Sequence, residues 1–234
     1  AEDAKLRYSS ISFISPIGDV LWVEAPLAEY YWMLASYETN LSKRRELLER
    51  ALEAGPDLLK RAENSGCPIN IQYGHHIFSK TLGFLAFVET NSEEKRRLLE
   101  KALGHRNESV QLTEQFLPYD YWNRGVMQKY LADIKTLLAD LAEDPETKKN
   151  MLQEAILDRE ASLKLCIKGV SFFEGKGSTS ESASIGIWLA LYGRILNSLY
   201  ELTHNTEHLR KAAKAFEDAI ESFQKIGAKK VWDS

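Results

Sequence analysis

The chain has 234 residues, of which 44% are hydrophobic and 27% charged, proportions that are typical of globular proteins. Its 30 Lys plus Arg against 34 Asp plus Glu give a net charge of −4, which argues against a dedicated nucleic-acid binder. No apolar run approaches the roughly 18–20 residues of a membrane helix. The two cysteines provide neither a disulfide framework nor a metal cage, and they leave the compartment open, with a reducing cytoplasm favoured.

The first segment lacks the features of a leader sequence. The chain begins at Ala1, without Met and without the zones of a signal peptide. Ala4, Tyr8 and Ile11 have the spacing of one helical face, as apolar residues near the other end of the chain also do. Either a leader has been removed or the chain is a piece of a longer protein, and this spacing favours the second alternative, with residues 1–24 as the remnant of a preceding repeat.

Helical periodicity dominates the rest of the chain. Apolar residues recur three and four apart in long segments rich in Leu, Ala, Glu and Lys, and strand signals are scarce. The sequence therefore predicts an all-α fold. Because proline breaks a helix interior, the six prolines are expected in connections or at helix starts. They occupy positions 16, 26, 56, 68, 118 and 145.

Internal repetition is the strongest signal. The block YETNLSKRRELLERAL at 37–52 and the block VETNSEEKRRLLEKAL at 88–103 are identical at nine of sixteen positions without a gap. Diverged copies follow at 141–156 and 202–220, and each copy comes after a more apolar segment. An alanine near the end of the blocks recurs at Ala51, Ala102, Ala155 and Ala219. Each unit is thus predicted to be an apolar inner helix, a short turn and an amphipathic outer helix.

The turns carry residues that start helices. Ser92, Asp144 and Thr206 are expected to be N-caps of outer helices, because Glu or Pro follows each of them. The units are expected at approximately 25–67, 68–117, 118–175 and 180–228, within a single helical-repeat domain over 1–234. Such units bury their apolar faces only by stacking on one another.

This pattern resembles the tetratricopeptide repeat family. The residues at the family's spacing are Leu82, Gly83, Leu99 and Ala102, with Ala212, Phe216 and Ala219 in the last outer helix. The resemblance spans roughly residues 25–228, and it implies an α-solenoid whose inner helices line a concave, peptide-binding groove. The units repeat every 51 to 64 residues, whereas family repeats have about 34, so longer helices and loops are expected.

The register that this resemblance sets also implies which side chains face the groove. In the second unit they are His76, Ile77, Lys80, Phe84 and Phe87, and at the start of the next inner helix they are Tyr121, Trp122 and Arg124. Trp, Tyr and Arg are enriched at interface hot spots. Packing between helices is the alternative for the aromatic residues. Thr81 and Phe84 stand where the family's carboxylate clamp needs Asn, which argues against binding of chaperone tails.

Three motifs resemble catalytic or ligand-binding patterns without meeting their geometry. His204-Asn-Thr-Glu207-His208 matches an inverted zinc-protease pattern, but its middle residues are typical of a turn, so the two rings need not converge. Cys67, His75 and His76 lack a partner cluster for zinc, and a surface histidine pair is expected. EGKGSTS at 174–180 lacks the Lys-Ser/Thr pair of a phosphate loop and is expected to be an inter-helix loop.

Basic clusters recur near the starts of the outer helices, at 43–45, 95–97, 148–149 and 210–211. Stacked units would place them in a ridge that could meet an acidic partner or nucleic acid. Because glutamates interleave on the same helices, a solvated and self-compensated face is the preferred interpretation.

The sequence thus predicts an all-α solenoid of about four helix-turn-helix units with long helices. We expect a non-catalytic scaffold or regulatory sensor domain that binds a protein or peptide partner. No catalytic residue, metal ligand or cofactor is assigned, a nucleic-acid partner is disfavoured, no membrane contact is expected, and homo-oligomer formation stays open. The alternatives are a helical bundle that binds a small molecule or metal, and a nucleic-acid-binding helical array.

Overall fold

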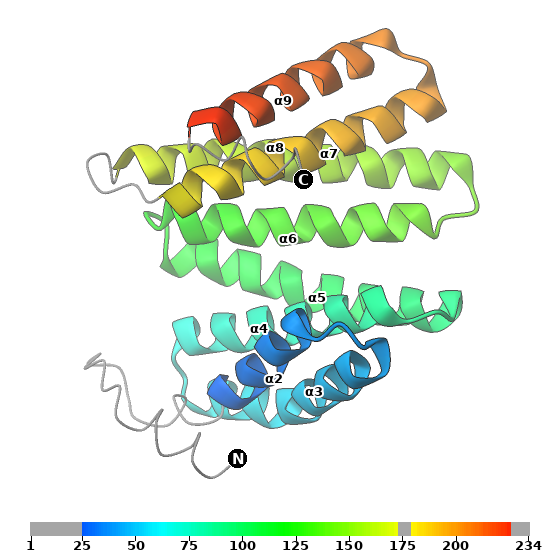
Figure 1. Cartoon of the computed structure of the whole chain (residues 1–234). Coiled ribbons are helices and arrows are strands. Elements are labelled where there is room, and N and C mark those ends of the chain that lie inside the picture. Colours follow the sequence, from blue (N-terminus) through cyan, green and yellow to red (C-terminus); the bar gives the residue numbers. More distant parts are fainter. Residues whose placement is uncertain (1–24, 173–178, 226–234) are drawn as a thin grey trace.

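The computed structural model describes residues 25–172 and 179–225, and this part of the chain consists of eight helices without a strand (Figure 1). The helices are α2 (Ala25–Tyr37), α3 (Leu41–Asn64), α4 (Pro68–Val88), α5 (Ser92–Phe116), α6 (Tyr121–Asp140), α7 (Pro145–Phe172), α8 (Thr179–Thr203) and α9 (Thr206–Lys225). The all-α prediction is confirmed. The expectations for residues 1–24 and for most of the 174–180 segment fall outside the described residues.

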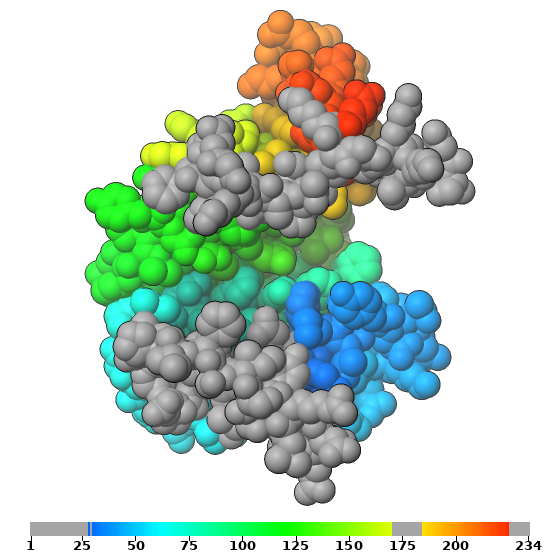
Figure 2. Space-filling model, turned by 60° about the vertical axis from the view of Figure 1, so that its left-hand side comes forward, coloured from blue at the N-terminus to red at the C-terminus, as the bar shows by residue number. Residues whose placement is uncertain are grey.

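The helices form a linear stack of hairpins. Helix α2 pairs with α3, α4 with α5, α6 with α7 and α8 with α9, and the second helix of each hairpin packs on the first helix of the next (Figure 1). Helix α4 also contacts both α2 and α6, so the first helices of these units share one layer, here called the inner layer. In Figure 2 the stack curves, with a hollow between the blue first hairpin and the orange-to-red last hairpin. The predicted α-solenoid is therefore observed.

The outer helices begin at equivalent caps, but two caps differ from the predicted ones. Asp144 is confirmed, since its Oδ2 accepts from the Thr147 amide at 2.8 Å. Asn91, rather than Ser92, caps α5 through an Oδ1 contact of 2.9 Å to the Glu94 amide. Asn205, rather than Thr206, plays this part in α9. Asn is a better N-cap than Thr, which explains the shift from Thr206 to Asn205.

The prediction that every proline marks a helix boundary is wrong at Pro56. This residue lies inside α3, whereas Pro68 and Pro145 begin helices as expected. The residue before it is Gly55, which has no Cβ to clash with the pyrrolidine ring. Gly55 also lies against Phe78 of α4, whose ring would be 2.3 Å from an added Cβ. The contact between Gly55 of α3 and Phe78 of α4 thus compensates for the tendency of Pro56 to break the helix.

Three outer helices bury the same register of residues. Leu48, Leu99 and Leu152 are fully buried at equivalent positions, and the repeated alanines follow three residues later. In α9 the buried residues are Ala212, Ala215 and Ala219. In this buried register, Ala215 rather than Ala219 corresponds to the repeated alanine, and α9 begins one residue later relative to that alanine than the other outer helices do. The assignment of Ala219 from sequence was therefore one turn too late.

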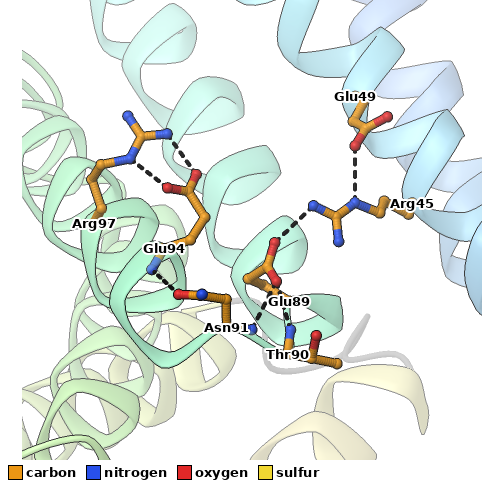
Figure 3. Close-up of polar contacts among 7 residues, drawn as sticks. All are labelled: Arg45, Glu49, Glu89, Thr90, Asn91, Glu94 and Arg97. Carbon is orange, nitrogen blue, oxygen red and sulfur yellow. Dashed lines mark hydrogen bonds and ion pairs between the residues drawn. The ribbon is translucent and has the colours of Figure 1, made fainter.

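Polar contacts join the turn of one unit to the outer helix of the unit before it (Figure 3). Glu89 follows α4, and its Oε1 accepts from the amides of Thr90 and Asn91 at 2.7 and 2.9 Å. Its Oε2 accepts from Arg45 of α3 at 2.7 Å. Arg96, the repeat equivalent of Arg45, likewise donates to the Leu141 carbonyl in the next turn. The same arginine position of the repeat therefore links the first unit to the second, through Arg45, and the second unit to the third, through Arg96.

Candidate functional site

Two arginines lie on the buried face of the outer helices. Arg106 of α5 and Arg159 of α7 each stand four residues after the repeated alanine, and both are fully buried. A buried serine follows three residues after each of them, at Ser109 and Ser162. A guanidinium in the interior requires a partner, because burial of an unpaired charge is costly. The two arginines meet this requirement in different ways.

Arg159 is neutralised from within the chain. Its Nη2 forms an ion pair with Oδ1 of Asp133 on α6, and Lys129 Nζ lies 2.8 Å from the other carboxylate oxygen. Ser162 Oγ donates to the Gly125 carbonyl at 2.7 Å. The inner helix of the third unit thus supplies a carboxylate to the arginine of its own outer helix.

Arg106 has no such carboxylate among the described residues. The repeat alignment places Lys80 in α4 where Asp133 stands in α6. Arg106 Nη1 lies 2.5 Å from His76 Nδ1, its Nη2 lies 3.3 Å from the His76 carbonyl, and its Nε has no hydrogen-bond partner in the described part of the chain. Burial lowers the pKa of Arg106 to about 10, so the side chain still carries its charge at pH 7.

His76 is a neutral base in this arrangement. Burial, with the nearby charges of Arg106 and Lys80, holds the pKa of His76 well below its usual value. A neutral ring with a bare Nδ1 can accept the hydrogen bond that Arg106 donates. The expectation of a surface histidine pair is wrong, because neither ring is exposed. His76 contacts Arg106, and the Nδ1 atom of His75 lies 3.0 Å from the Nδ1 atom of His105. The residues of α5 that cover this pair lie thirty positions away in the sequence.

Aromatic rings complete the surroundings of these cations. Lys80 Nζ lies 3.3 Å from the ring centroid of Trp32 on α2. Tyr130 of α6 has Lys129 Nζ at 4.0 Å and Arg106 Cζ at 4.9 Å from its ring centroid. Rings attract cations through their quadrupole. We call this group the inner cluster; it consists of Trp32, His76, Lys80, Arg106, Lys129 and Tyr130.

Three of the groove residues predicted in the second unit lie in or beside the inner cluster, and Ile77 and Phe87 do not. Phe84 packs edge-on against Trp32, with ring centroids 5.4 Å apart. Phe87 is 64% exposed, and with Phe84 it lines a shallow hollow of about 100 Å³ between α2, α3 and α4. Ile77 is buried in the core between α3 and α4. His76 and Lys80 belong to the inner cluster itself.

The predicted residues at the start of α6 lie apart from the inner cluster. Trp122 packs against Trp188 of α8, with ring centroids 5.5 Å apart, and belongs to a buried cluster between the third and fourth units. The Tyr121 ring has Lys168 Nζ 4.1 Å from its centroid. Arg124 donates to the Pro118 carbonyl at 2.7 Å. These side chains thus stabilise contacts between helices at this end of α6.

The remaining motifs form no site in the described residues. Helix α8 ends at Thr203 and α9 begins at Thr206, so His204 and His208 do not share a helix. Within the part of the chain that the structure describes, no three His, Cys, Asp or Glu residues are grouped to hold a metal ion. In three basic clusters one side chain pairs with a glutamate of its own helix: Arg97 with Glu94, Lys149 with Glu146 and Arg210 with Glu207. The self-compensated interpretation is confirmed for these pairs.

Sequence reasoning missed four members of the inner cluster. Arg106 had a detectable signal, because a charged residue stands on the apolar face of an outer helix at the same place in two repeats. Trp32, Lys129 and Tyr130 had none, since their proximity depends on how α2, α4 and α6 stack.

No described helix is long and apolar enough to cross a membrane.

Comparisons with known proteins assign no family. No family model and no curated protein matches the chain. Among solved structures it is similar to the DHF58 filament, with 15% identity and a TM-score of 0.44 over 89% of this chain and 94% of that one. With the de novo designed helical repeat protein DHR64 it shares 16% identity, and the TM-score is 0.39 over 89% of this chain and 95% of that one. With the DHF79 filament it shares 15% identity, and the TM-score is 0.42 over 93% of this chain and 100% of that one.

Proposed function

We propose that the chain is a tetratricopeptide-like scaffold that binds an acidic segment of a partner protein along its inner layer. The observation that carries this proposal lies in the inner cluster, where the buried charge of Arg106 has no carboxylate partner among the described residues. Lys80, Arg106 and Lys129 converge on this cluster, and the nearby carboxylate of Asp133 already pairs with Lys129 and Arg159. Cations beside low-dielectric walls raise the local concentration of anions.

The third unit provides an internal comparison for the expected contact. There the Asp133 carboxylate neutralises Arg159, whereas Lys80 replaces that carboxylate beside Arg106. A Glu or Asp side chain from a partner would supply the missing negative charge from outside. Because Arg106 is fully buried, we expect Lys80, Lys129 and the Tyr130 hydroxyl to contact the ligand. Arg106 would act through its field and by holding His76 in place.

A binding measurement with a simple probe tests this proposal. The probe is a fluorescein-labelled peptide in which Glu alternates with Leu, and fluorescence anisotropy reports its binding at low salt. We expect Lys80→Gln and Lys129→Gln each to weaken binding about tenfold, since a hydrogen bond to a charged group contributes about 1.5–3 kcal/mol. Raising the salt concentration should weaken binding to the unmodified chain, because exposed charges are screened.

Matched controls separate this site from general charge effects. Lys101→Gln removes an exposed lysine from α5, outside the inner cluster, and should leave the affinity unchanged. A peptide with Lys in place of Glu should not bind. Equal weakening by Lys80→Gln and Lys101→Gln would show attraction without a site. Failure of the acidic probe to bind at low salt would refute the proposal.

A further inference from the structure

The last helix carries an apolar stripe on its exposed face. Leu209, Ala213, Phe216 and Ile220 lie at i, i+4, i+7 and i+11 of α9, the spacing of one helical face. All four are exposed, and Ile220 is 56% accessible. We call this face the C-terminal stripe. Helix α9 packs on α8 mainly through Ala212, Ala215 and Ala219, and the ring of Phe216, at the edge of the stripe, also lies against Gly193 of α8.

This stripe departs from the pattern of the preceding outer helices. The positions equivalent to Ala213 carry Glu49, Glu100 and Gln153, and those equivalent to Ile220 carry Pro56, Asn107 and Glu160. The positions equivalent to Leu209 carry Arg45, Arg96 and Lys149. Two of these equivalents of Leu209, Arg45 in α3 and Arg96 in α5, bind to the turn of the next unit. The outer helix at the end of the stack therefore carries apolar residues where the preceding outer helices carry polar ones, except that α3 has Pro56 at the position of Ile220.

The first described helix carries a second stripe at the other end of the stack. Tyr30, Met33, Leu34 and Tyr37 lie at i, i+3, i+4 and i+7 of α2, on the side opposite the buried Ala28 and Ala35. We call this face the N-terminal stripe. Leu34 is 39% accessible. Its repeat equivalents are buried: Leu85 is 5% accessible and Leu138 is 3% accessible.

The two stripes are the two halves of a contact that the chain already makes. An outer helix packs on the next inner helix at α3–α4, α5–α6 and α7–α8. Leu85 and Leu138 lie in the core cluster that this stacking forms. Among the described residues, α9 is an outer helix with no inner helix after it, and α2 is an inner helix with no outer helix before it. A second copy presents the missing inner helix in the form that the repeat requires.

We propose that copies of this chain associate end to end, with the N-terminal stripe of one copy packed on the C-terminal stripe of another. Such a contact joins two different surfaces, so each copy keeps one free end after pairing. The association therefore continues into rings or open filaments rather than stopping at a dimer. The apolar residues at both ends are covered in this way.

Sedimentation velocity of the full chain over a range of concentrations tests the proposal. The monomer has a mass of 26.7 kDa, and we expect the average mass to rise past the dimer as concentration increases. Leu34→Glu and Ile220→Glu each place a charge in one stripe, and each variant alone should remain monomeric. Because each variant keeps one intact stripe, an equimolar mixture of the two should form a dimer and nothing larger.

Two results would overturn the proposal. One is a monomeric unmodified chain at every concentration up to the solubility limit. The other is self-association of Leu34→Glu alone, because that requires contact between two C-terminal stripes. Leu157→Glu is the matched control, since Leu157 is 65% exposed on α7 outside both stripes, and this variant should associate like the unmodified chain. Circular dichroism confirms that each variant is folded.

Discussion

His76 couples the stability of the fold to pH. Its pKa is held well below its usual value, chiefly by burial and then by Arg106 and Lys80. Between that lowered pKa and the unfolded value of about 6.5, the unfolded chain binds a proton that the folded chain does not. The free energy of unfolding therefore falls as the pH falls through this range. His75 and His105, whose pKa values are also lowered by burial, act in the same direction.

Replacement of His76 by Gln should reduce this dependence. Gln does not titrate, so the slope of the unfolding free energy between pH 7.5 and pH 5 should decrease by up to about one proton per molecule. Urea unfolding followed by circular dichroism measures the slope. His204→Asn is the control, because that ring is exposed and Asn tolerates the positive φ of 52° at this position. An unchanged slope in His76→Gln would contradict the assignment.

The sequence was informative about single residues where local rules decide and silent where packing decides. Asp144 caps α7 as predicted because its cap contacts lie within four residues. Pro56 was misjudged because the contact between Gly55 and Phe78 joins two helices. His76 and Lys80 lie one turn apart on α4, as their spacing predicts, but their aromatic and guanidinium partners come from α2, α5 and α6. No local pattern contains that information.

At the scale of elements, the turn after α4 links secondary structure to stacking. Glu89 accepts hydrogen bonds from two amides of the turn and from Arg45 of the preceding unit. The amide of Asn91 is the main reason that the pKa of Glu89 is lowered, with smaller contributions from Arg45 and Thr90. A lowered carboxyl pKa stabilises the fold above the unfolded value of about 4.5, and this contribution is lost as the pH falls.

Glu89→Ala should therefore lower the urea midpoint at pH 7, and the difference from the unmodified chain should shrink below pH 4. Glu49→Ala is the matched control, since Glu49 contacts the same Arg45 as an exposed pair within α3. Exposed pairs of this kind contribute little, so the midpoint of the control should hardly move. Equal losses in both variants would show that the turn contacts of Glu89 are unimportant.

At the scale of the whole molecule, order along the chain becomes order in space. Each hairpin contacts mainly the hairpins next to it, so a repeat stack behaves as a one-dimensional array of coupled units. The repeated blocks predicted this arrangement because their recurrence is a property of the sequence itself. The degree of curvature could not be predicted, since it depends on the small rotation between units that side-chain packing determines.

A packing defect in one unit should therefore spread unequally through the stack. Gly125 of α6 lies so close to α7 that an added Cβ would be 2.2 Å from Cys166 Sγ and 2.9 Å from the Ser162 carbonyl oxygen. Gly125→Ala should cost about 1–3 kcal/mol through overpacking. Hydrogen exchange followed by mass spectrometry should then show faster exchange in α6 and α7, a smaller effect in α5 and α8, and little change in α2 and α3.

Gly83→Ala is the control. No atom lies within 4 Å of its added Cβ, so this variant should instead slow exchange in α4, because Ala is favoured over Gly in helices by about 1 kcal/mol. An equal acceleration in all eight helices of Gly125→Ala would mean that the described stack unfolds as one cooperative unit, and the one-dimensional description would then be wrong.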